Sequence, residues 1–394
     1  MTVPATPAPG GRRLLAVLLV HSALTQVITF VLRPTTAYRA IELDVPVAWL
    51  GVLTASFAVV PLVLAVPSGQ ATDRFGERRV MLAGAVLMLL SAVVLATERG
   101  GAAGLVAGSV VLGTGHLLSV VGQQAAVANT AGPGRFDTAF GHYTFAASLG
   151  QAIGPALITV VGGEGALPDT RPIFVVSAVL GALLLVCTAV LRFPVRERAG
   201  GSAEAGGMGT LLRLPGLVRA LTVSCVVLAA VDITLVYLPA LGADRGLAAG
   251  SVGLLLTLRA AASMTSRFFL GRLVRLTGRR RLMLCSVALA AVTMAAVAVP
   301  MPVAGTAVLV VLLGLGLGVG QPLTMSWLAE MAPAGLRGRA MSLRLTGNRL
   351  GQVLIPSTVG LLAAGVGSAG VLWATAGALA LAGAAARRLH VDGG

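Results

Sequence analysis

The chain has 394 residues, of which 56% are hydrophobic and only 11% are charged. A soluble domain of this length needs a larger charged fraction to cover its surface, so the composition excludes an ordinary globular protein. The net charge of +15 comes without any lysine, which excludes a Walker A nucleotide-binding loop and makes direct use of ATP unexpected.

Apolar runs of about 18 or more residues recur along the chain, and this length crosses roughly 30 Å of hydrocarbon. In the first half they fall at 14–32, 48–66, 80–97, 102–127, 139–161 and 172–191. In the second half they fall at 217–239, 249–270, 282–300, 303–327, 341–364 and 368–386. The sequence therefore predicts an all-α membrane protein with twelve transmembrane helices in two pseudo-symmetric six-helix bundles.

A long polar, Gly-rich segment from Arg196 to Thr210 separates the two sets of spans. It predicts an N-terminal bundle over 1–195, a cytoplasmic linker over 196–214 and a C-terminal bundle over 215–394. Arginine concentrates at alternate membrane edges, which argues against a nucleic-acid partner. By the positive-inside rule, we expect both termini in the cytoplasm, with the chain spanning the plasma (inner) membrane.

The two halves repeat one another at an offset of about two hundred residues. The segment from Gly69 to Leu82 follows the second span, and its near copy from Gly271 to Leu284 follows the eighth. The repeat continues in the fifth and eleventh spans, where Leu-Gly-Gln followed by a proline occurs at 149–155 and at 350–356. Duplicated halves of this kind are typical of secondary transporters.

The first copy of the repeated loop resembles the signature of the major facilitator superfamily. The matching residues are Gly69, Asp73, Arg74, Gly76, Arg78 and Arg79, whereas the second copy has Arg275 at the position of Asp73. The resemblance implies alternating access, no cofactor and no enzymatic activity. It also implies that Asp73 holds the cytoplasmic ends of the bundles together, with Gly338–Arg339 and Arg135 as candidate partners.

The fifth span is similar to a motif of bacterial drug–proton antiporters, on the residues Gly150, Gly154 and Pro155. This resemblance implies export of a solute in exchange for protons, and these three residues join the first loop as expected parts of the conformational gate. Relatives carry an arginine in the fourth span that takes part in proton coupling, and here Ser109 stands at that position. The coupling group is then expected elsewhere.

Polar groups inside a span usually face a cavity or a partner helix, because they are costly against lipid. Those on helices able to reach the central cavity are Gln26, Thr29, Arg33, His116, Gln123, Gln151, Asp232, Arg259, Asn348 and Gln352. Asp232 is the only carboxylate within a predicted span, and Arg259 lies deep enough to reach it. Asp232 and His116 are the candidate proton carriers, since each titrates near neutral pH in a suitable environment. Arg259 and Arg349 are the most deeply placed arginines.

We expect a secondary transporter for a small organic solute, with proton-coupled efflux as the first interpretation. The alternative is proton-coupled uptake of an organic anion, because arginine exceeds acid within the spans. A non-transporting membrane sensor or a channel on the same scaffold is the alternative of another class. The expected partners are the solute, protons and the lipid bilayer, with no metal, and the expected state is a monomer.

Overall fold

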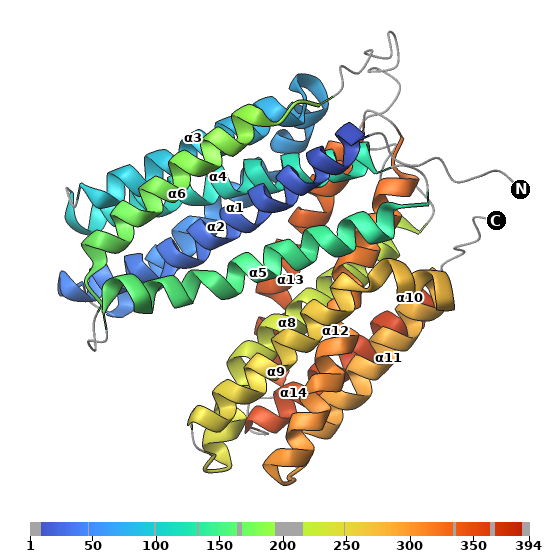
Figure 1. Cartoon of the computed structure of the whole chain (residues 1–394). Helices are drawn as coiled ribbons and strands as arrows, with labels where there is room; N and C mark the ends of the chain where they lie inside the picture. The colour runs from blue at the N-terminus through green and yellow to red at the C-terminus, as the bar shows by residue number, and fades with distance from the viewer. Residues whose placement is uncertain are drawn as a thin grey trace, which may run out of the picture. The chain divides into compact units, whose positions relative to one another are not determined.

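A computed structural model describes residues 9–45, 47–97, 100–131, 134–163, 168–193, 216–247, 249–333, 336–362 and 367–387. The regular elements in these ranges are all helices (Figure 1). The first half contains α1 (Pro9–Glu42), α2 (Val47–Phe75), α3 (Glu77–Ala96), α4 (Gly101–Thr130), α5 (Phe136–Gly162) and α6 (Thr170–Val190). The second half contains α8 (Leu217–Asp244), α9 (Ala249–Phe268), α10 (Leu270–Thr277), α11 (Arg279–Val297), α12 (Val303–Met331), α13 (Arg337–Leu362) and α14 (Gly367–Ala386).

The all-helical prediction is confirmed, and every predicted span coincides with a helix, with the short α10 continuing the eighth. Nine helices in the described ranges are long and apolar enough to cross a membrane. The other three expected spans are the helices α2, α9 and α13, of which α9 and α13 carry arginines along their length. The full count of twelve membrane crossings stays a prediction.

The chain divides into two compact units. Unit 1 contains residues 1–131, 146–205 and 333–343, and unit 2 contains residues 132–145, 206–332 and 344–394. Each unit therefore includes the first turns of a helix whose remainder belongs to the other unit, namely α13 for unit 1 and α5 for unit 2. The predicted linker lies outside the described residues, and the predicted bundle boundaries stay a prediction.

In unit 1, α3 packs against α4 and α6, α1 packs against the same two helices, and α2 packs against α4. The core contains Ile28, Met88 and Phe174, all without solvent exposure. Helices α3 and α4 approach closely at a glycine pair, since a Cβ atom on Gly115 would lie 2.8 Å from the carbonyl oxygen of Gly84. Small residues at crossings are the usual way for membrane helices to gain packing contact.

Unit 2 repeats this glycine arrangement. Gly314 on α12 lies against the backbone of Arg259 on α9, and a Cβ on Gly316 would lie 2.7 Å from the carbonyl oxygen of Ser286 on α11. The corresponding Gly113 and Gly115 of α4 lie against α2 and α3. The internal repeat read from the sequence therefore has the same packing role in both halves.

Candidate functional site

Three of the predicted cavity residues meet in unit 1 and form the amide–imidazole cluster, defined as Gln26, His116 and Gln151. The side-chain nitrogen Nε2 of Gln26 lies 3.3 Å from Nε2 of His116, and Nε2 of Gln151 donates to Oε1 of Gln26 at 3.3 Å. In this orientation the imidazole nitrogen accepts a hydrogen bond from the Gln26 amide. Gln26 is buried, whereas His116 and Gln151 are half-buried.

Close approach of α5 to α1 brings the two glutamines together. A Cβ atom on Gly150 would lie 2.9 Å from Cβ of Gln26, and one on Gly154 would lie 2.7 Å from Cβ of Phe30. These contacts are shorter than side chains tolerate, so only glycine fits at this crossing. The antiporter-like glycines therefore position Gln151 beside Gln26.

The ring of Phe57 on α2 connects the cluster to Arg33. Its centroid lies 5.7 Å from that of the His116 ring, and Cζ of Arg33 lies 4.5 Å above the Phe57 ring. The Arg33 contact has cation–π geometry, which suits an exposed guanidinium at the edge of an apolar span. The positive charge of Arg33 and the titratable His116 thus contact the same aromatic ring.

Gln123 belongs to a different and fully buried network. Its Nε2 donates to Oγ1 of Thr25 at 2.9 Å and lies 2.8 Å from Nδ1 of His21, while Nε2 of His21 lies 2.8 Å from Oγ1 of Thr188. Because the side-chain N–H of Gln123 donates to Nδ1 of His21, this ring nitrogen carries no proton. His21 is therefore the neutral tautomer with its proton on Nε2. Contacts of this kind tie α1, α4 and α6 together.

Thr29 is also buried, and its hydroxyl donates to the carbonyl oxygen of Thr25 in its own helix at 2.8 Å. This bond uses the hydroxyl locally. The roles of Thr29 and Gln123 at a cavity remain predictions.

In unit 2, Arg259 of α9 is buried, with only 5% of its surface exposed. Its Nε has no hydrogen-bond acceptor among the described residues. The half-buried Asp232 of α8 exerts an electrostatic attraction on this guanidinium. The two residues are therefore near enough to influence one another, as their predicted depths suggested.

Asn348 belongs to a largely buried polar cluster of unit 2. Its Oδ1 accepts a hydrogen bond from Oγ of Ser224 on α8 at 2.9 Å. The same Ser224 oxygen and Oε1 of Gln321 on α12 both accept from Nη1 of Arg344, each at 3.4 Å. Arg344 was not among the sequence-based candidates, although it lies one turn before Asn348. The side chain of Gln352 lies outside the described residues.

The repeated loop forms the predicted contact between Asp73 and the start of α13. Oδ1 of Asp73 accepts from the backbone N–H of Gly338 at 2.8 Å, and Oδ2 accepts from that of Arg339 at 3.1 Å. Burial raises the pKa of Asp73 to about 6, although the two backbone hydrogen bonds and the charge of Arg339 act in the opposite direction. The expected partner at the start of span eleven is thus confirmed.

The other residues of this loop have local roles. Gly69 lies against α13, where a Cβ would be 2.7 Å from the carbonyl oxygen of Gly338. Gly76 has a φ of 89°, a backbone conformation that favours glycine, and it ends the turn between α2 and α3. Arg78 donates to the carbonyl oxygen of Ala189 at 2.7 Å, and Arg74 lies over the ring of Phe75.

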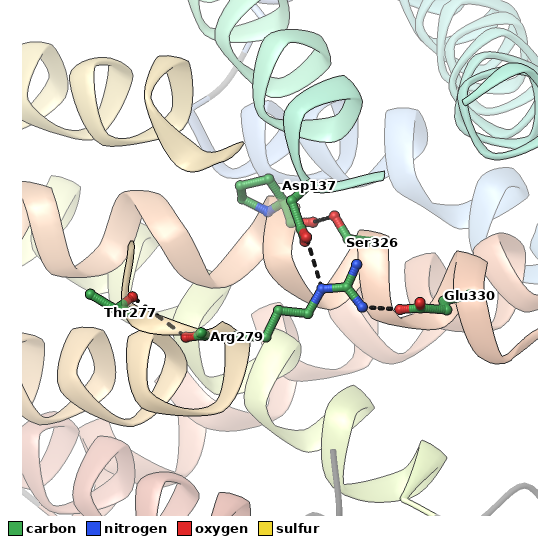
Figure 2. Close-up of polar contacts among 7 residues, drawn as sticks. Asp137, Thr277, Arg279, Ser326 and Glu330 are labelled. Carbon is green, nitrogen blue, oxygen red and sulfur yellow. Dashed lines mark hydrogen bonds and ion pairs between the residues drawn. The ribbon is translucent and has the colours of Figure 1, made fainter. Parts of the chain in front are cut away.

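Two clusters of charged and polar side chains lie at helix ends, one in each unit, and they are related by the sequence repeat. In unit 2, Nε of Arg279 at the start of α11 donates to Oδ2 of Asp137 on α5 at 2.8 Å, and its Nη1 pairs with Glu330 at the end of α12 (Figure 2). In unit 1, Asn129 at the end of α4 contacts Glu77 at the start of α3, and its Oδ1 accepts from Nη1 of Arg337 on α13 at 3.3 Å.

The two clusters correspond through the sequence repeat, but the charges at matching positions differ. Glu77 aligns with Arg279, and the neutral Asn129 aligns with the acidic Glu330. Each cluster joins the start of one helix, the end of the next and the start of a helix from the other half of the sequence. The second loop has Arg275 where the first has Asp73, and its Arg279 pairs with Asp137 on α5.

Membrane-length helices, glycine-lined crossings and buried polar clusters define a multi-pass membrane transporter built from two related halves. The chain belongs to the Major Facilitator Superfamily, whose sequence profile matches residues 15–250 and again 220–392. It is therefore a transporter of small molecules and not an enzyme. No match to the sequence is found among curated proteins.

Several solved structures share the fold at low sequence identity. The human organic anion transporter MFSD10 aligns with a TM-score of 0.77 at 18% identity, covering 96% of this chain and 100% of that one. The E. coli fucose:proton symporter FucP aligns with a TM-score of 0.81 at 14% identity, covering 95% and 97%. The proton:xylose symporter XylE aligns with a TM-score of 0.76 at 16% identity, covering 95% of each chain. At these identities the likeness establishes the fold alone.

Proposed function

We propose that the protein exports a small organic solute across the plasma membrane by alternating access, in exchange for protons. The amide–imidazole cluster of Gln26, His116 and Gln151 carries this proposal. It joins a titratable histidine to the glycine crossing of α1 and α5, on residues that resemble an antiporter motif. Intramembrane ionisable groups usually serve the transported solute or ion.

Protonation of His116 would change the hydrogen bonds of this cluster. A neutral imidazole accepts from the Gln26 amide, whereas an imidazolium offers only donors. Gln26 must then turn its oxygen toward His116, and that oxygen is the acceptor of Gln151. The charge state of a residue on α4 is in this way transmitted to the contact between α1 and α5. Asp232, under the electrostatic influence of Arg259, is the alternative proton carrier.

The experiment uses purified full-length protein in vesicles with an imposed pH gradient. The transported probe is the compound that stabilises the protein most in a thermal-shift screen of cationic dyes, organic acids and sugars. We expect the gradient to drive transport, and we expect His116→Gln or Asp232→Asn to abolish this drive while downhill exchange continues. The exposed Asp44→Asn serves as the control.

Transport that ignores the pH gradient would contradict proton coupling. Full coupling in a double variant of His116 and Asp232 would show that the proton binds elsewhere. Accumulation under an acidic interior supports export by antiport, whereas accumulation under an acidic exterior supports the second candidate, proton-coupled uptake of an organic anion. The buried guanidinium groups of Arg259 and Arg344 favour this second candidate.

The same proposal assigns a conformational role to the residues at the helix ends. The contact of Asp73 with Gly338 and Arg339 would form when the cavity is closed to the cytoplasm and break when it opens there. Gly69, Arg74, Gly76 and Arg78 shape this contact, and Gly150, Gly154 and Pro155 shape the crossing of α1 and α5. The arginine distribution supports cytoplasmic termini, and a monomer suffices for the cycle.

A further inference from the structure

We propose that a pocket at one end of unit 2 binds the headgroup of an anionic phospholipid such as phosphatidylglycerol. Hereafter the headgroup pocket means the space between α11, α12 and α14 whose lining includes Arg280, Met283, Leu323, Trp327 and Ala386. Its volume is about 340 Å³, including the part that opens to the outside. None of these residues belongs to the polar clusters that carry the proposed function, so the inference is independent of it.

The headgroup pocket lies at the ends of three membrane-length helices. Helix α11 begins at Arg279, α12 ends at Met331 and α14 ends at Ala386, and each is long and apolar enough to span a bilayer. The lining residues lie within about two turns of these ends. The pocket is therefore at the level of the lipid headgroups, on the side that the arginine distribution predicts to be cytoplasmic.

Most of the lining is apolar. Met283 and Leu323 are buried core residues, Leu284 is half-buried, and Trp327 is 8% exposed. An indole has an apolar ring and one N–H donor, and such rings favour the headgroup level of a membrane. A free phosphate ion would lose its hydration against these groups, whereas the glycerol and first methylene groups of a phospholipid would bury apolar surface there. The lining therefore favours a lipid over a soluble anion.

Arg280 supplies the positive charge of the headgroup pocket. The neighbouring Arg279 also lines it, but its charge is offset by Asp137 and Glu330 (Figure 2). Arg280 is exposed and pairs with no carboxylate in the part of the chain that the structure describes. Its Nη2 donates to the backbone carbonyl oxygen of Arg387 at 2.7 Å, which leaves its other N–H groups for a phosphate oxygen. One guanidinium matches the single negative charge of a phosphodiester.

At the corresponding place in unit 1 the helices pack more closely. Through the repeat, Gly122 matches Leu323 and Ala126 matches Trp327. A Cβ atom on Gly122 would lie 2.5 Å from Cγ of Met81, so α3 packs directly against the backbone of α4 there. The larger side chains at these two positions in unit 2 line a space instead. The pocket is therefore a feature of the second half and not a general consequence of the fold.

Tryptophan fluorescence can test whether lipid occupies the headgroup pocket. The chain has three tryptophans, and replacing Trp49 and Trp373 with phenylalanine leaves Trp327 as the only reporter. The purified full-length protein is placed in phosphatidylcholine vesicles that contain the same small fraction of a labelled lipid, either phosphatidylglycerol or phosphatidylcholine. The label is a nitroxide near the glycerol end of one acyl chain. Because a nitroxide quenches a nearby indole, the ratio of the two quenching constants measures the preference for the anionic headgroup.

We expect labelled phosphatidylglycerol to be preferred roughly fivefold or more at Trp327, which is the factor that one arginine near the membrane surface contributes toward an anionic lipid. Trp373 provides the control. Its Nε1 donates to the carbonyl oxygen of Ala295 near the other end of α11, so it lies at the opposite interface. With Trp49 and Trp327 replaced instead, we expect no preference. Equal quenching of Trp327 by the two lipids would overturn the proposal.

Two arginine variants separate a built site from a general attraction of anionic lipid to a basic helix end. Arg280→Gln should remove the preference at Trp327. Arg281→Gln should retain it, because Arg281 is also exposed and is adjacent in sequence but does not line the pocket. An equal loss in both variants would show that anionic lipid gathers at this edge without a site, which would overturn the proposal.

Inorganic phosphate distinguishes a lipid headgroup from a soluble anion. The preference at Trp327 should be the same in phosphate and in chloride at equal ionic strength. A preference that phosphate alone removes would assign the pocket to the free anion and overturn the lipid assignment. If Arg280→Gln fails to fold, the comparison of the two lipids and the phosphate experiment still decide the question. Binding is read without transport, so these outcomes are separate from those that test the proposed function.

Discussion

The carboxylate of Asp73 accepts a hydrogen bond from the backbone N–H of Gly338 at 2.8 Å, although 265 residues separate them in sequence. Its second oxygen accepts from the next amide, that of Arg339. The first amides of a helix have no partner within the helix and carry partial positive charge. One acid at the end of α2 therefore satisfies two donors at the start of α13.

Replacement of this acid should reduce transport without preventing folding. Asp73→Asn retains one acceptor but turns an NH₂ group toward a backbone N–H, which costs about 1–3 kcal/mol in the state that contains this contact. We expect a several-fold lower transport rate in reconstituted vesicles and a normally folded protein by circular dichroism.

The matched control for that change is Asp169→Asn. Asp169 caps α6, and its side chain accepts from the backbone N–H of Arg171. Asparagine caps helices as well as aspartate does, so this variant should transport like the wild type. Wild-type transport by Asp73→Asn would remove the α2–α13 contact from the mechanism.

The contact between Asp73 and α13 should become more stable at mildly acidic pH. Burial raises the pKa of Asp73 from 3.8 to about 6, so the contact state binds a proton more tightly than a solvated carboxylate does. Stability is then gained as the pH falls through about 6 and is lost above it. Between pH 7.5 and pH 5 the gain is about 1.4 kcal/mol, or roughly tenfold in population.

Hydrogen exchange at the start of α13 can measure this dependence. The amides of Gly338 and Arg339 donate to Asp73, so their protection, corrected for the intrinsic pH dependence of exchange, reports the contact. We expect about tenfold higher protection at pH 5 than at pH 7.5, and no such change in Asp73→Asn. Amide protection that rises with pH would contradict the expected stabilisation of this contact at acidic pH.

The Arg279 cluster should depend more on Asp137 than on Glu330. The Asp137 side chain is 7% exposed and accepts from Arg279 at 2.8 Å, whereas Glu330 is 45% exposed. A nearly buried charged hydrogen bond is worth about 1.5–3 kcal/mol, and an exposed ion pair about 0–1 kcal/mol. Double-mutant cycles with Arg279→Gln, Asp137→Asn and Glu330→Gln, read as unfolding free energies, give both coupling energies.

Salt provides an independent check on this ranking, because screening acts mainly on exposed charges. Coupling to Glu330 should fall as salt rises, while coupling to Asp137 should change little. Equal couplings for the two acids would show that exposure does not decide their contributions.

An added methyl group at the α1–α5 crossing should disturb the amide–imidazole cluster. The Cβ of Gly150→Ala would lie 2.9 Å from Cβ of Gln26, so the helices must separate at a cost of about 1–3 kcal/mol. We expect a lower melting temperature together with weaker proton coupling in vesicles. Gly377→Ala is the control, because nothing lies within 4 Å of its Cβ and alanine favours a helix by up to about 1 kcal/mol. Equal behaviour of the two variants would contradict a tight crossing.

Much of this organisation is readable from the sequence, because hydropathy and the internal repeat are strong signals. Gly113 and Gly314, which correspond through the repeat, both lie at close helix crossings, and the loop motif anticipated the partner of Asp73. Gln26, His116 and Gln151 were each expected at a cavity, and they contact one another. When the faces of neighbouring helices are predicted correctly, contacts between the polar side chains on those faces follow.

It was harder to predict from the sequence which arginine side chains are buried. Arg349 was predicted to lie deep along its span, and it is half-buried; Arg344, five positions earlier and therefore on another face, is only 1% exposed. The sequence did contain a signal for Arg344, because Asn348, a predicted cavity residue, lies four residues later and therefore on the same helix face. Gln123 and His116 were both expected at the cavity, yet Gln123 bonds to His21 on α1, a partner that the sequence of α4 alone does not reveal.

The long separation between Asp73 and its partners also bears on how the chain is made. Synthesis proceeds from the N-terminus, and early segments fold before later ones emerge. The end of α2 must therefore remain without its partner while nearly all the remaining helices are synthesised, until α13 appears. The charge of Asp73 keeps that end at the water interface meanwhile, and the last stretch of the chain completes a unit that the first stretch began. A chain that stops before Gly338 therefore lacks part of both units.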